Sequence, residues 1–299
     1  MNIQWYPGHM TKTKRMIASN LKLVDVVAEV IDARIPISSR NPDIDELVGE
    51  KPRVVVLNRS DQADPRGNKR WADYFRSCGI YVMESDAKSG TGVNQFSVTV
   101  QHALKEKIAQ WREKGQVGRP IRAMVVGVPN VGKSTFINKI SKRKSAKTQD
   151  RPGVTRGKQW VTVSQGLELL DTPGILWPKF DDEHIGLHLA FTGAVRDAIM
   201  DIETLGFHLM ELLKERNPES IAARYKINVT QELTGWELLE AAGKKRGFLI
   251  SGGEVDLERM ANILLDEFRG GKLGRVTLEL PEDLERKAEP NENAGSMGN

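Results

Sequence analysis

A glycine-rich segment at residues 127–134 reads GVPNVGKS and has the residue types needed to bind a phosphate chain. It fits the pattern G-x-x-x-x-G-K-[ST] and stands between an apolar strand-like run and a helical run. The glycines let backbone N–H groups turn towards phosphate oxygens at the start of the following helix. Lys133 is expected to neutralise β- and γ-phosphate charge, and the Ser134 hydroxyl is expected to bind Mg²⁺.

Residues 171–174 read DTPG and supply a second element of the same chemistry. In this pattern Asp171 reaches Mg²⁺ through water and the Gly174 N–H contacts the γ-phosphate. The intervening loop is punctuated by Gly and Pro, and its Thr155 is the hydroxyl expected at the remaining Mg²⁺ position. The alternative for Thr155 is an ordinary surface threonine.

Residues 58–61 read NRSD directly after an apolar strand run and are similar to the N-K-x-D base-recognition element of GTPases. Guanine presents two adjacent donors, N1–H and the 2-amino group, which one carboxylate can accept. Asp61 would therefore select guanine over adenine. Arg59 replaces the usual lysine, although its aliphatic stem can still lie along the base.

A second base-reading segment at residues 85–92 reads SDAKSGTG and looks like the S-A-K-x-G loop of GTPases. Asp86 takes the place of the serine, and Lys88 follows Ala87 as in that loop. The backbone N–H of Ala87 would bind the guanine O6. The alternative is an ordinary strand-to-helix turn with glycine.

Buried strands with helices between them must position these segments. Four apolar, β-rich runs are interpreted as buried parallel strands: Val24–Asp32, Arg53–Leu57, Ile80–Glu84 and Ile121–Gly127. A long helix is predicted over Gly92–Lys114, and a strand pair over 160–164 and 167–171. This alternation predicts an α/β class protein with a doubly wound, mostly parallel sheet.

The pattern changes after Pro178, where helical segments follow one another without buried-strand runs. We therefore expect a first domain at 1–180, a smaller, mainly helical C-terminal domain at 181–280, and an acidic, disordered tail at 281–299. The helical segments are expected near 183–199, 202–215, 218–225, 233–243 and 254–268.

The composition of the 299 residues, with 39% hydrophobic and 28% charged, is that of a soluble globular protein. Cys78 is the only cysteine, so neither an intrachain disulfide nor a zinc site built from cysteines can form. We find no export signal and no segment that approaches the ~20 apolar residues of a membrane span. A cytoplasmic location without membrane contact is expected.

Charge is distributed unevenly along the chain although the net charge is only +4. Between Lys133 and Lys158 nine basic residues face the single Asp150. Such a block favours a polyanionic partner, whose binding would gain from counterion release. The alternative is a solvated, lysine-rich surface.

The order of the motifs is reversed relative to ordinary GTPases, because the base elements precede the phosphate elements. A sheet tolerates such a rearrangement, since its packing depends on strand neighbours rather than on where the chain begins. The sequence thus resembles a circularly permuted, Ras-like P-loop GTPase. With WYPGHM at 5–10, DARIP at 32–36 and DTPGILWP at 171–178, residues 2–280 resemble the ribosome biogenesis GTPase A (YlqF/RbgA) family.

The resemblance implies that GTP is hydrolysed to GDP in a site that binds Mg²⁺. The candidate nucleotide-binding residues are Asn58, Arg59, Asp61, Asp86, Ala87, Lys88, Asn130, Val131, Gly132, Lys133, Ser134, Thr135 and Gly174. The Mg²⁺ candidates are Ser134, Thr155 and Asp171. Asn130 also stands where related GTPases hold a K⁺ ion.

Ras-like enzymes position water with a glutamine just after D-x-x-G, whereas this chain has Ile175. Isoleucine cannot orient water, so intrinsic hydrolysis is expected to be slow. The resemblance implies that His9 performs this task; the alternative is a polar residue near a helix start. Lys133, Thr155 and Gly174 complete the catalytic candidates. His184, His188 and His208 are expected to be helical surface or core residues.

The resemblance also implies partners: the precursor of the large (50S) ribosomal subunit late in its assembly, its rRNA and its ribosomal proteins. GTP would order residues 145–158 and 172–182, and the basic block with residues 244–246 would then bind rRNA until hydrolysis releases it. A monomer is expected. Two other classes stay open: a GTP-gated binding module with incidental turnover, and a P-loop kinase or ATPase acting on a small molecule.

Overall fold

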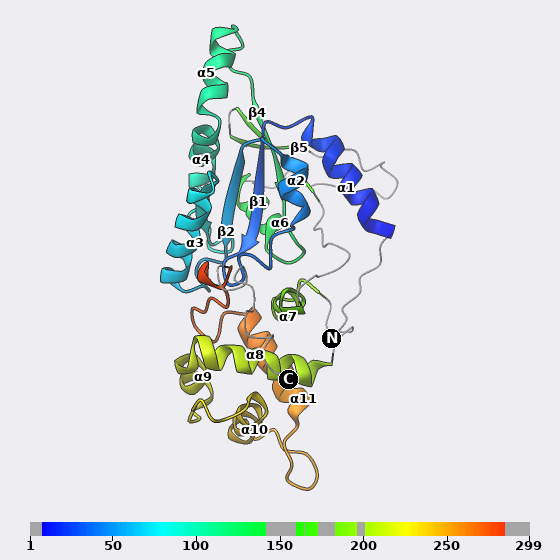
Figure 1. Cartoon of the computed structure of the whole chain (residues 1–299), viewed down its shortest axis with the longest axis vertical. Helices are drawn as coiled ribbons and strands as arrows, with labels where there is room; N and C mark the ends of the chain where they lie inside the picture. The colour runs from blue at the N-terminus through cyan, green and yellow to red at the C-terminus, as the bar shows by residue number, and fades with distance from the viewer. Residues whose placement is uncertain (1–7, 142–159, 165, 173–182, 196–200, 285–299) are drawn as a thin grey trace, which may run out of the picture.

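The computed structural model describes residues 8–141, 160–164, 166–172, 183–195 and 201–284. An α/β unit and a group of helices lie one above the other along the longest axis (Figure 1). In the described part of the chain no helix is long and apolar enough to cross a membrane.

A six-stranded sheet with the order β3-β2-β1-β4-β6-β5 forms the centre of the α/β unit. All neighbouring pairs are parallel except β5 and β6, which are antiparallel. The strands are β1 (Val26–Asp32), β2 (Arg53–Asn58), β3 (Tyr81–Ser85), β4 (Ile121–Val126), β5 (Trp160–Ser164) and β6 (Leu167–Asp171). The predicted doubly wound, mostly parallel α/β sheet is therefore confirmed.

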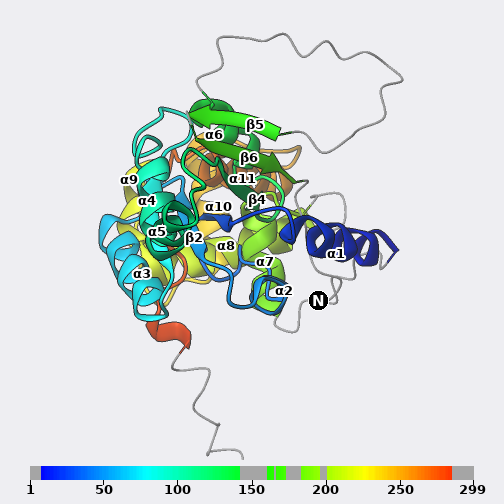
Figure 2. The same ribbon diagram turned by 90° about the horizontal axis from the view of Figure 1, so that it is seen from above.

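Alternate residues of the strands face two different layers of helices, as the period of two along a strand requires. Val27 and Met124 pack in one cluster with α1 (Gly8–Leu21) and α2 (Asp43–Val48), while α3 (Pro65–Ser77) covers the same face beside Val55. Val26 and Val125 face α4 (Gln95–Ala103) and α6 (Lys133–Ile140) on the other side. Figure 2 shows the sheet with helices to either side.

Two predicted elements of the α/β unit differ from the observed ones. The single helix expected over Gly92–Lys114 is divided into α4 (Gln95–Ala103) and α5 (Lys105–Glu113), because Leu104 leaves helical geometry at φ −109° and ψ 13°. Strand β3 lies at the edge of the sheet with Tyr81 exposed, so it is not a buried strand. An edge strand has one neighbour only, and its outer residues meet solvent.

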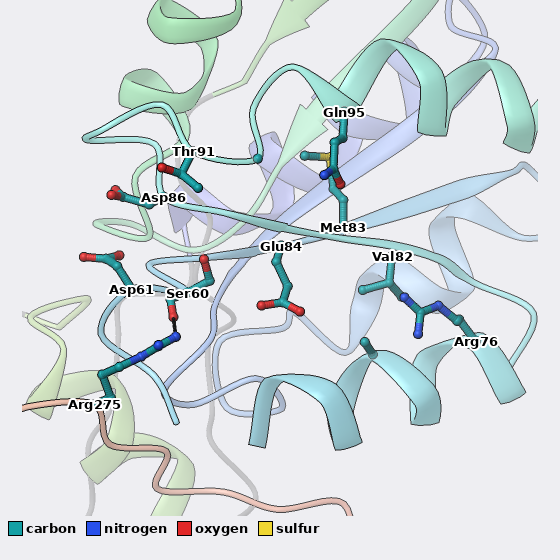
Figure 3. A pocket seen from close by; sticks show the side chains of 12 residues that line it. Ser60, Asp61, Arg76, Val82, Met83, Glu84, Asp86, Thr91, Gln95 and Arg275 are labelled. Carbon is teal, nitrogen blue, oxygen red and sulfur yellow. Dashed lines mark hydrogen bonds between the residues drawn. The ribbon is translucent and has the colours of Figure 1, made fainter. Parts of the chain in front are cut away.

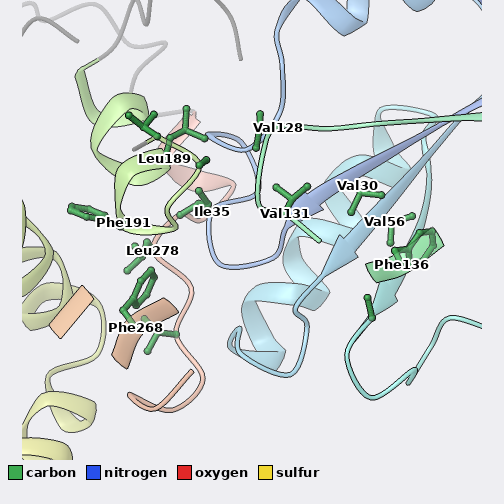
Figure 4. Packing of buried hydrophobic residues seen from close by; sticks show 14 of the residues in the cluster. Val30, Ile35, Val56, Val128, Val131, Phe136, Leu189, Phe191, Phe268 and Leu278 are labelled. Carbon is green, nitrogen blue, oxygen red and sulfur yellow. The ribbon is translucent and has the colours of Figure 1, made fainter. Parts of the chain in front are cut away.

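The C-terminal helices continue the core of the α/β unit rather than forming a separate one. They are α7 (Glu183–Phe191), α8 (Ile202–Arg216), α9 (Pro218–Tyr225), α10 (Gly235–Arg246) and α11 (Leu257–Arg269), while α6 (Lys133–Ile140) belongs to the α/β unit. One hydrophobic cluster extends from Val30 and Ile35 to Leu189, Phe268 and Leu278. Figure 4 shows these side chains converging between the two groups of elements.

After α11 the chain turns back to the α/β unit, and we call residues 270–284 the return segment. Leu278 N–H donates to the Arg34 carbonyl at 2.8 Å, and the Trp71 indole donates to the Glu279 carbonyl at 2.8 Å. Leu284 packs beside the Trp71 cluster. Residues 281–284, the first four of the segment predicted as a tail, are thus packed and hydrogen-bonded.

Glu279 fastens the return segment to both parts of the protein. Its buried carboxylate accepts hydrogen bonds from the Ile37 N–H at 2.8 Å, from the Ser38 hydroxyl, and from Nδ1 of His188 at 2.7 Å. Burial alone would raise the pKa of Glu279, but the His188 and Ser38 contacts outweigh burial and hold the pKa below its usual range. The charged carboxylate therefore stabilises the joint between α7 and the α/β unit.

Replacing Glu279 with glutamine should lower the free energy of unfolding by about 2 kcal/mol at pH 7, since buried hydrogen bonds to a charge are lost. A depressed pKa stabilises the folded state above the ordinary glutamate pKa of about 4.3, and this stabilisation is lost as the pH falls below it. Urea unfolding of the wild type and E279Q between pH 3 and 7 should therefore show the difference shrinking in acid.

The matched control is Glu282→Gln on the same segment, which removes a partly exposed ion pair with Arg70 worth about 0.2–1 kcal/mol. A stability difference between the wild type and E279Q that did not vary with pH would contradict the charged state assigned to Glu279.

Candidate nucleotide-binding site

The glycine-rich segment predicted from the sequence forms the turn between β4 and α6. Gly127 has φ +150°, and a Cβ there would lie 2.3 Å from the Val30 carbonyl oxygen. Gly132 has φ +95°, and a Cβ would lie 2.4 Å from the Asn58 amide nitrogen. Only glycine fits either position, so the loop can curl closely over the end of the sheet.

Lys133 begins α6, and its ammonium group lies within the loop itself. Nζ donates to the carbonyls of Gly127 at 3.0 Å and Val128 at 2.8 Å. The exposed Ser134 and Thr135 follow at the helix N-terminus, where backbone N–H groups and the helix dipole favour an anion. The turn therefore has the donors and the charge of a phosphate-binding loop.

A cavity of about 580 Å³ opens over this loop. Its walls come from both parts of the protein: Arg59, Asn130, Gly132, Lys133, Ser134 and Thr135 from the α/β unit, and Thr192, Gly193, Val195 and Arg269 from the C-terminal helices. A phosphate group bound here would be covered by residues of both parts.

Asn58 joins the phosphate loop to the base-reading loops. Its Nδ2 donates to the Val131 carbonyl at 2.7 Å, and its Oδ1 accepts the Ala87 N–H at 3.1 Å. The side chain is 2% exposed, so both contacts are shielded from water. These bonds connect the ends of β2, β3 and β4, which the sequence had predicted as elements of one site.

The Ala87 N–H, which is predicted to bind the guanine O6, donates to Asn58 in this structure. Asn58 ends β2 opposite Ser85 in the neighbouring β3, which puts its amide oxygen next to the Ala87 N–H. Lys88 contributes through its backbone, since its carbonyl accepts a bond from Lys139 of α6 at 3.2 Å.

Asp61 and Asp86 line a second cavity of about 570 Å³. Figure 3 shows both carboxylates pointing to the same side of the pocket. Asp86 accepts the backbone N–H groups of Lys88 at 2.9 Å and Ser89 at 3.2 Å. Burial would raise the pKa of Asp86, but the Ser89 side chain and these backbone bonds outweigh burial and lower the pKa. Asp86 therefore stabilises the turn that follows it. A serine at this position could stabilise the turn in the same way.

Asp61 and Lys133 line two different cavities, although the sequence analysis expected them to bind opposite ends of one nucleotide. The cavities adjoin along the chain, because Arg59 lines the phosphate cavity and Ser60 lines the base cavity. Asn58, Arg59 and Ser60 are consecutive in the chain. The described residues thus place the base and phosphate elements at neighbouring positions along one edge of the sheet.

The sequence is similar to that of known GTPases. Residues 122–230 match the model of a family described as 50S ribosome-binding GTPase. Over 97% of both chains, the sequence is 46% identical to ribosome biogenesis GTPase A of Bacillus cereus. It is 33% identical to the Thermotoga maritima relative of that name, over 94% of this chain and 96% of the relative. The chain belongs to the ribosome biogenesis GTPase A family.

Solved structures of this family share the fold. A GDP-bound YlqF superposes with a TM-score of 0.65 at 30% identity, and the match covers 90% of this chain and 100% of that one. YlqF from T. maritima bound to GNP gives a TM-score of 0.63 over 91% of this chain and 99% of that one. The predicted circular permutation of the GTPase domain agrees with these neighbours.

Arg59 connects the family's base element to both the phosphate loop and the C-terminal helices. At φ +58°, it donates to the Asn130 carbonyl at 2.9 Å and to the Arg269 carbonyl at 3.2 Å, and its Nε lies 3.6 Å from Asp32. Burial lowers the pKa of Arg59, and the Asp32 carboxylate opposes that shift. Arg59 reaches these three groups through three different guanidinium nitrogens, whereas a lysine has a single nitrogen.

Arg34 and Arg269, for which the sequence predicts no role, also join the α/β unit to the C-terminal helices. Arg34 is buried against Asp32 with a 2.8 Å ion pair and donates to the Phe268 carbonyl at 2.7 Å. Arg269 donates to the carbonyls of Ala190 at 2.7 Å and Phe191 at 3.0 Å. The sequence D-A-R at 32–34 is the one signal that marks Arg34. Its partner, the Phe268 carbonyl at the end of α11, cannot be found from the sequence.

Several predicted residues lie outside the described part of the site. Thr155 and Gly174 are not described, nor are the side chains of His9 at the start of α1 and Asp171 at the end of β6. Ser134 is the one Mg²⁺ candidate that is described, and it lines the phosphate cavity. No cluster of three or more His, Cys, Asp or Glu side chains suited to a metal occurs within the described ranges.

Removing the Asn58 amide should weaken nucleotide binding, because the Val131 carbonyl and the Ala87 N–H both lose a buried partner. We expect N58A to bind GDP about 10–100-fold more weakly than the wild type, as measured by isothermal titration calorimetry. Asn94→Ala, at an exposed position without a capping hydrogen bond, is the matched control and should bind as the wild type does. Unchanged affinity in a folded N58A protein would contradict the bridging role.

Proposed function

We propose that the chain binds and hydrolyses GTP and acts late in assembly of the large (50S) ribosomal subunit. In this proposal it binds the subunit precursor, its rRNA and its ribosomal proteins in the GTP state and leaves after hydrolysis. The observation that carries the proposal is the Asn58 bridge between a phosphate loop and a base loop, in a chain of the ribosome biogenesis GTPase A family. A cytoplasmic monomer is part of the same proposal.

Lys133 and Ser134 would begin the chemistry. Lys133 must exchange the Gly127 and Val128 carbonyls for phosphate oxygens, so the loop holds its cation in place before the ligand arrives. Oxygen donors of the kind offered by Ser134, Thr155 and Asp171 suit Mg²⁺. When bound, that ion neutralises charge on the β- and γ-phosphates.

Asn130 keeps an oxygen available for a cation. Its Nδ2 donates to the Gly193 carbonyl at 2.5 Å, which orients the amide and leaves Oδ1 as the atom able to bind K⁺. This contact also joins the phosphate loop to the chain just after α7. A K⁺ ion at Asn130 would therefore lie at the joint between the GTPase domain and the C-terminal helices.

His9 is the residue we propose to orient the attacking water, because Ile175 offers no polar atom for that task. Turnover by the isolated protein should then be slow, and the large subunit should stimulate it by fixing the N-terminal segment near the γ-phosphate. Lys133, Thr155 and Gly174 would stabilise charge and position the phosphate around that water.

Basic residues would contact rRNA phosphates. Lys244 and Lys245 are exposed near the end of α10. They would add to the RNA contacts proposed for residues 133–158. Arg246 was also expected to bind RNA, but its guanidinium lies 3.0 Å from Glu267 and stacks on Tyr225. Arg246 thus stabilises the helical domain, and the surface cations Lys244 and Lys245 are the better candidates.

Binding to large subunits tests the proposed function. Co-sedimentation should retain the protein with a non-hydrolysable GTP analogue and release it with GDP. Raising the salt concentration from 50 to 200 mM should weaken binding at least about tenfold, because phosphate contacts release counterions. Equal binding in both nucleotide states would contradict the switch. Phosphate release at saturating subunits separates a stimulated enzyme from a GTP-gated binding module.

Replacing His9 with alanine should lower subunit-stimulated turnover about 10²-fold or more, as expected when a water-positioning group is lost. GDP affinity should change less than about twofold, since no nucleotide contact is assigned to His9. Steady-state phosphate release and calorimetric GDP binding measure the two quantities. A parallel loss of affinity would indicate misfolding and would contradict a catalytic role.

A further inference from the structure

Arg275 of the return segment contacts the loop that carries Asp61, and we call residues 60–64 the base loop. Its Nη2 donates to the Ser60 carbonyl at 2.8 Å, and its Nε donates to the Ala63 carbonyl at 2.9 Å. Figure 3 shows Arg275 rising from the C-terminal chain to Ser60, next to Asp61. The adjacent Val276 N–H donates to the Gln62 carbonyl at 2.9 Å.

These bonds fix the backbone on both sides of Asp61. The Ser60 carbonyl belongs to the peptide group that precedes the Asp61 Cα, and the Gln62 and Ala63 carbonyls follow it. The return segment thus fixes the direction from which the Asp61 side chain leaves the backbone. Asp61 lines the cavity that Arg275 also lines.

The return segment is itself held in position. Thr277 accepts the Asp64 N–H at 3.0 Å and packs on Gly67, where a Cβ would lie 2.9 Å from the threonine hydroxyl. Val276 and Leu278 are buried in the hydrophobic cluster that includes the C-terminal helices. The place of Arg275 is therefore set by the helical domain and not by the base loop alone.

We propose that Arg275 is a positioning residue for guanine selection. Through the Ser60 and Ala63 carbonyls it places the Asp61 carboxylate where both guanine donors, N1–H and the 2-amino group, can reach it. Hydrogen bonds weaken steeply with poor alignment, so a displaced carboxylate keeps less of the two-donor contact. The helical domain thereby takes part in reading the base. This inference rests on the proposed GTP binding.

Inosine diphosphate provides the decisive probe, because it lacks the 2-amino group and keeps the rest of GDP. Calorimetry should compare GDP, inosine diphosphate and ADP in the wild type, R275A, R275K and K272A. Lys272 is an exposed cation on the same segment and is the matched control. Arg275 is exposed as well, so R275A should fold, which its thermal midpoint without nucleotide will verify.

The wild type should prefer GDP to inosine diphosphate at least about tenfold, since a site built for a donor rejects the analogue without it. In R275A, GDP affinity should fall about tenfold and the preference should drop to about threefold or less. R275K can reach one carbonyl, so its GDP affinity and its preference for GDP should lie between those of R275A and the wild type. K272A should match the wild type in both quantities.

A purely structural role would weaken both nucleotides equally, so an unchanged preference in folded R275A would overturn the proposal. A second comparison uses the D61A background, where adding R275A should not change the remaining preference. A further change there would also overturn it, because Arg275 would then act by a route other than Asp61. Wild-type protein that bound ADP as tightly as GDP would refute the proposed function itself, which is a separate result.

Discussion

The Asn58 side chain is the contact on which the site depends, because it occupies the point where three strand ends converge. It donates to the phosphate loop through the Val131 carbonyl and accepts from the loop after β3 through the Ala87 N–H. Gly132 has no Cβ, and this is what lets the loop approach the amide so closely. A buried amide whose nitrogen and oxygen are both bonded has one orientation. Asn58 therefore fixes the position of the two loops relative to each other.

Arginines form the joint between the GTPase domain and the C-terminal helices. Arg34 and Arg59 donate to carbonyls at the end of α11, while Arg269 donates to carbonyls at the end of α7. Helix C-termini present unsatisfied carbonyls and partial negative charge, which guanidinium groups satisfy. Arg59 and Arg269 also line the phosphate cavity, so this joint lies where phosphate charge would change during hydrolysis.

Much of the architecture was predictable because its signals are local. Apolar runs located the four parallel strands to within two residues, and GVPNVGKS located the phosphate loop between β4 and α6. The break at Leu104 was missed because apolar periodicity continues through it. The edge position of β3 was missed because an apolar run does not reveal how many neighbours a strand has. The bond from the Ala87 N–H to Asn58 has no sequence signal, since it depends on a side chain of the adjacent strand.

The sequence alone determined the fold class and the family, since both follow from patterns of residue types adjacent in the chain. Tertiary structure alone decided how the C-terminal helices reach the site. Arg34 meets a carbonyl 234 residues away, and Arg275 meets one 215 residues away. Every residue carries a carbonyl, so an acceptor of this kind has no sequence signature. Only the packing of the return segment and α11 against the sheet could select these partners.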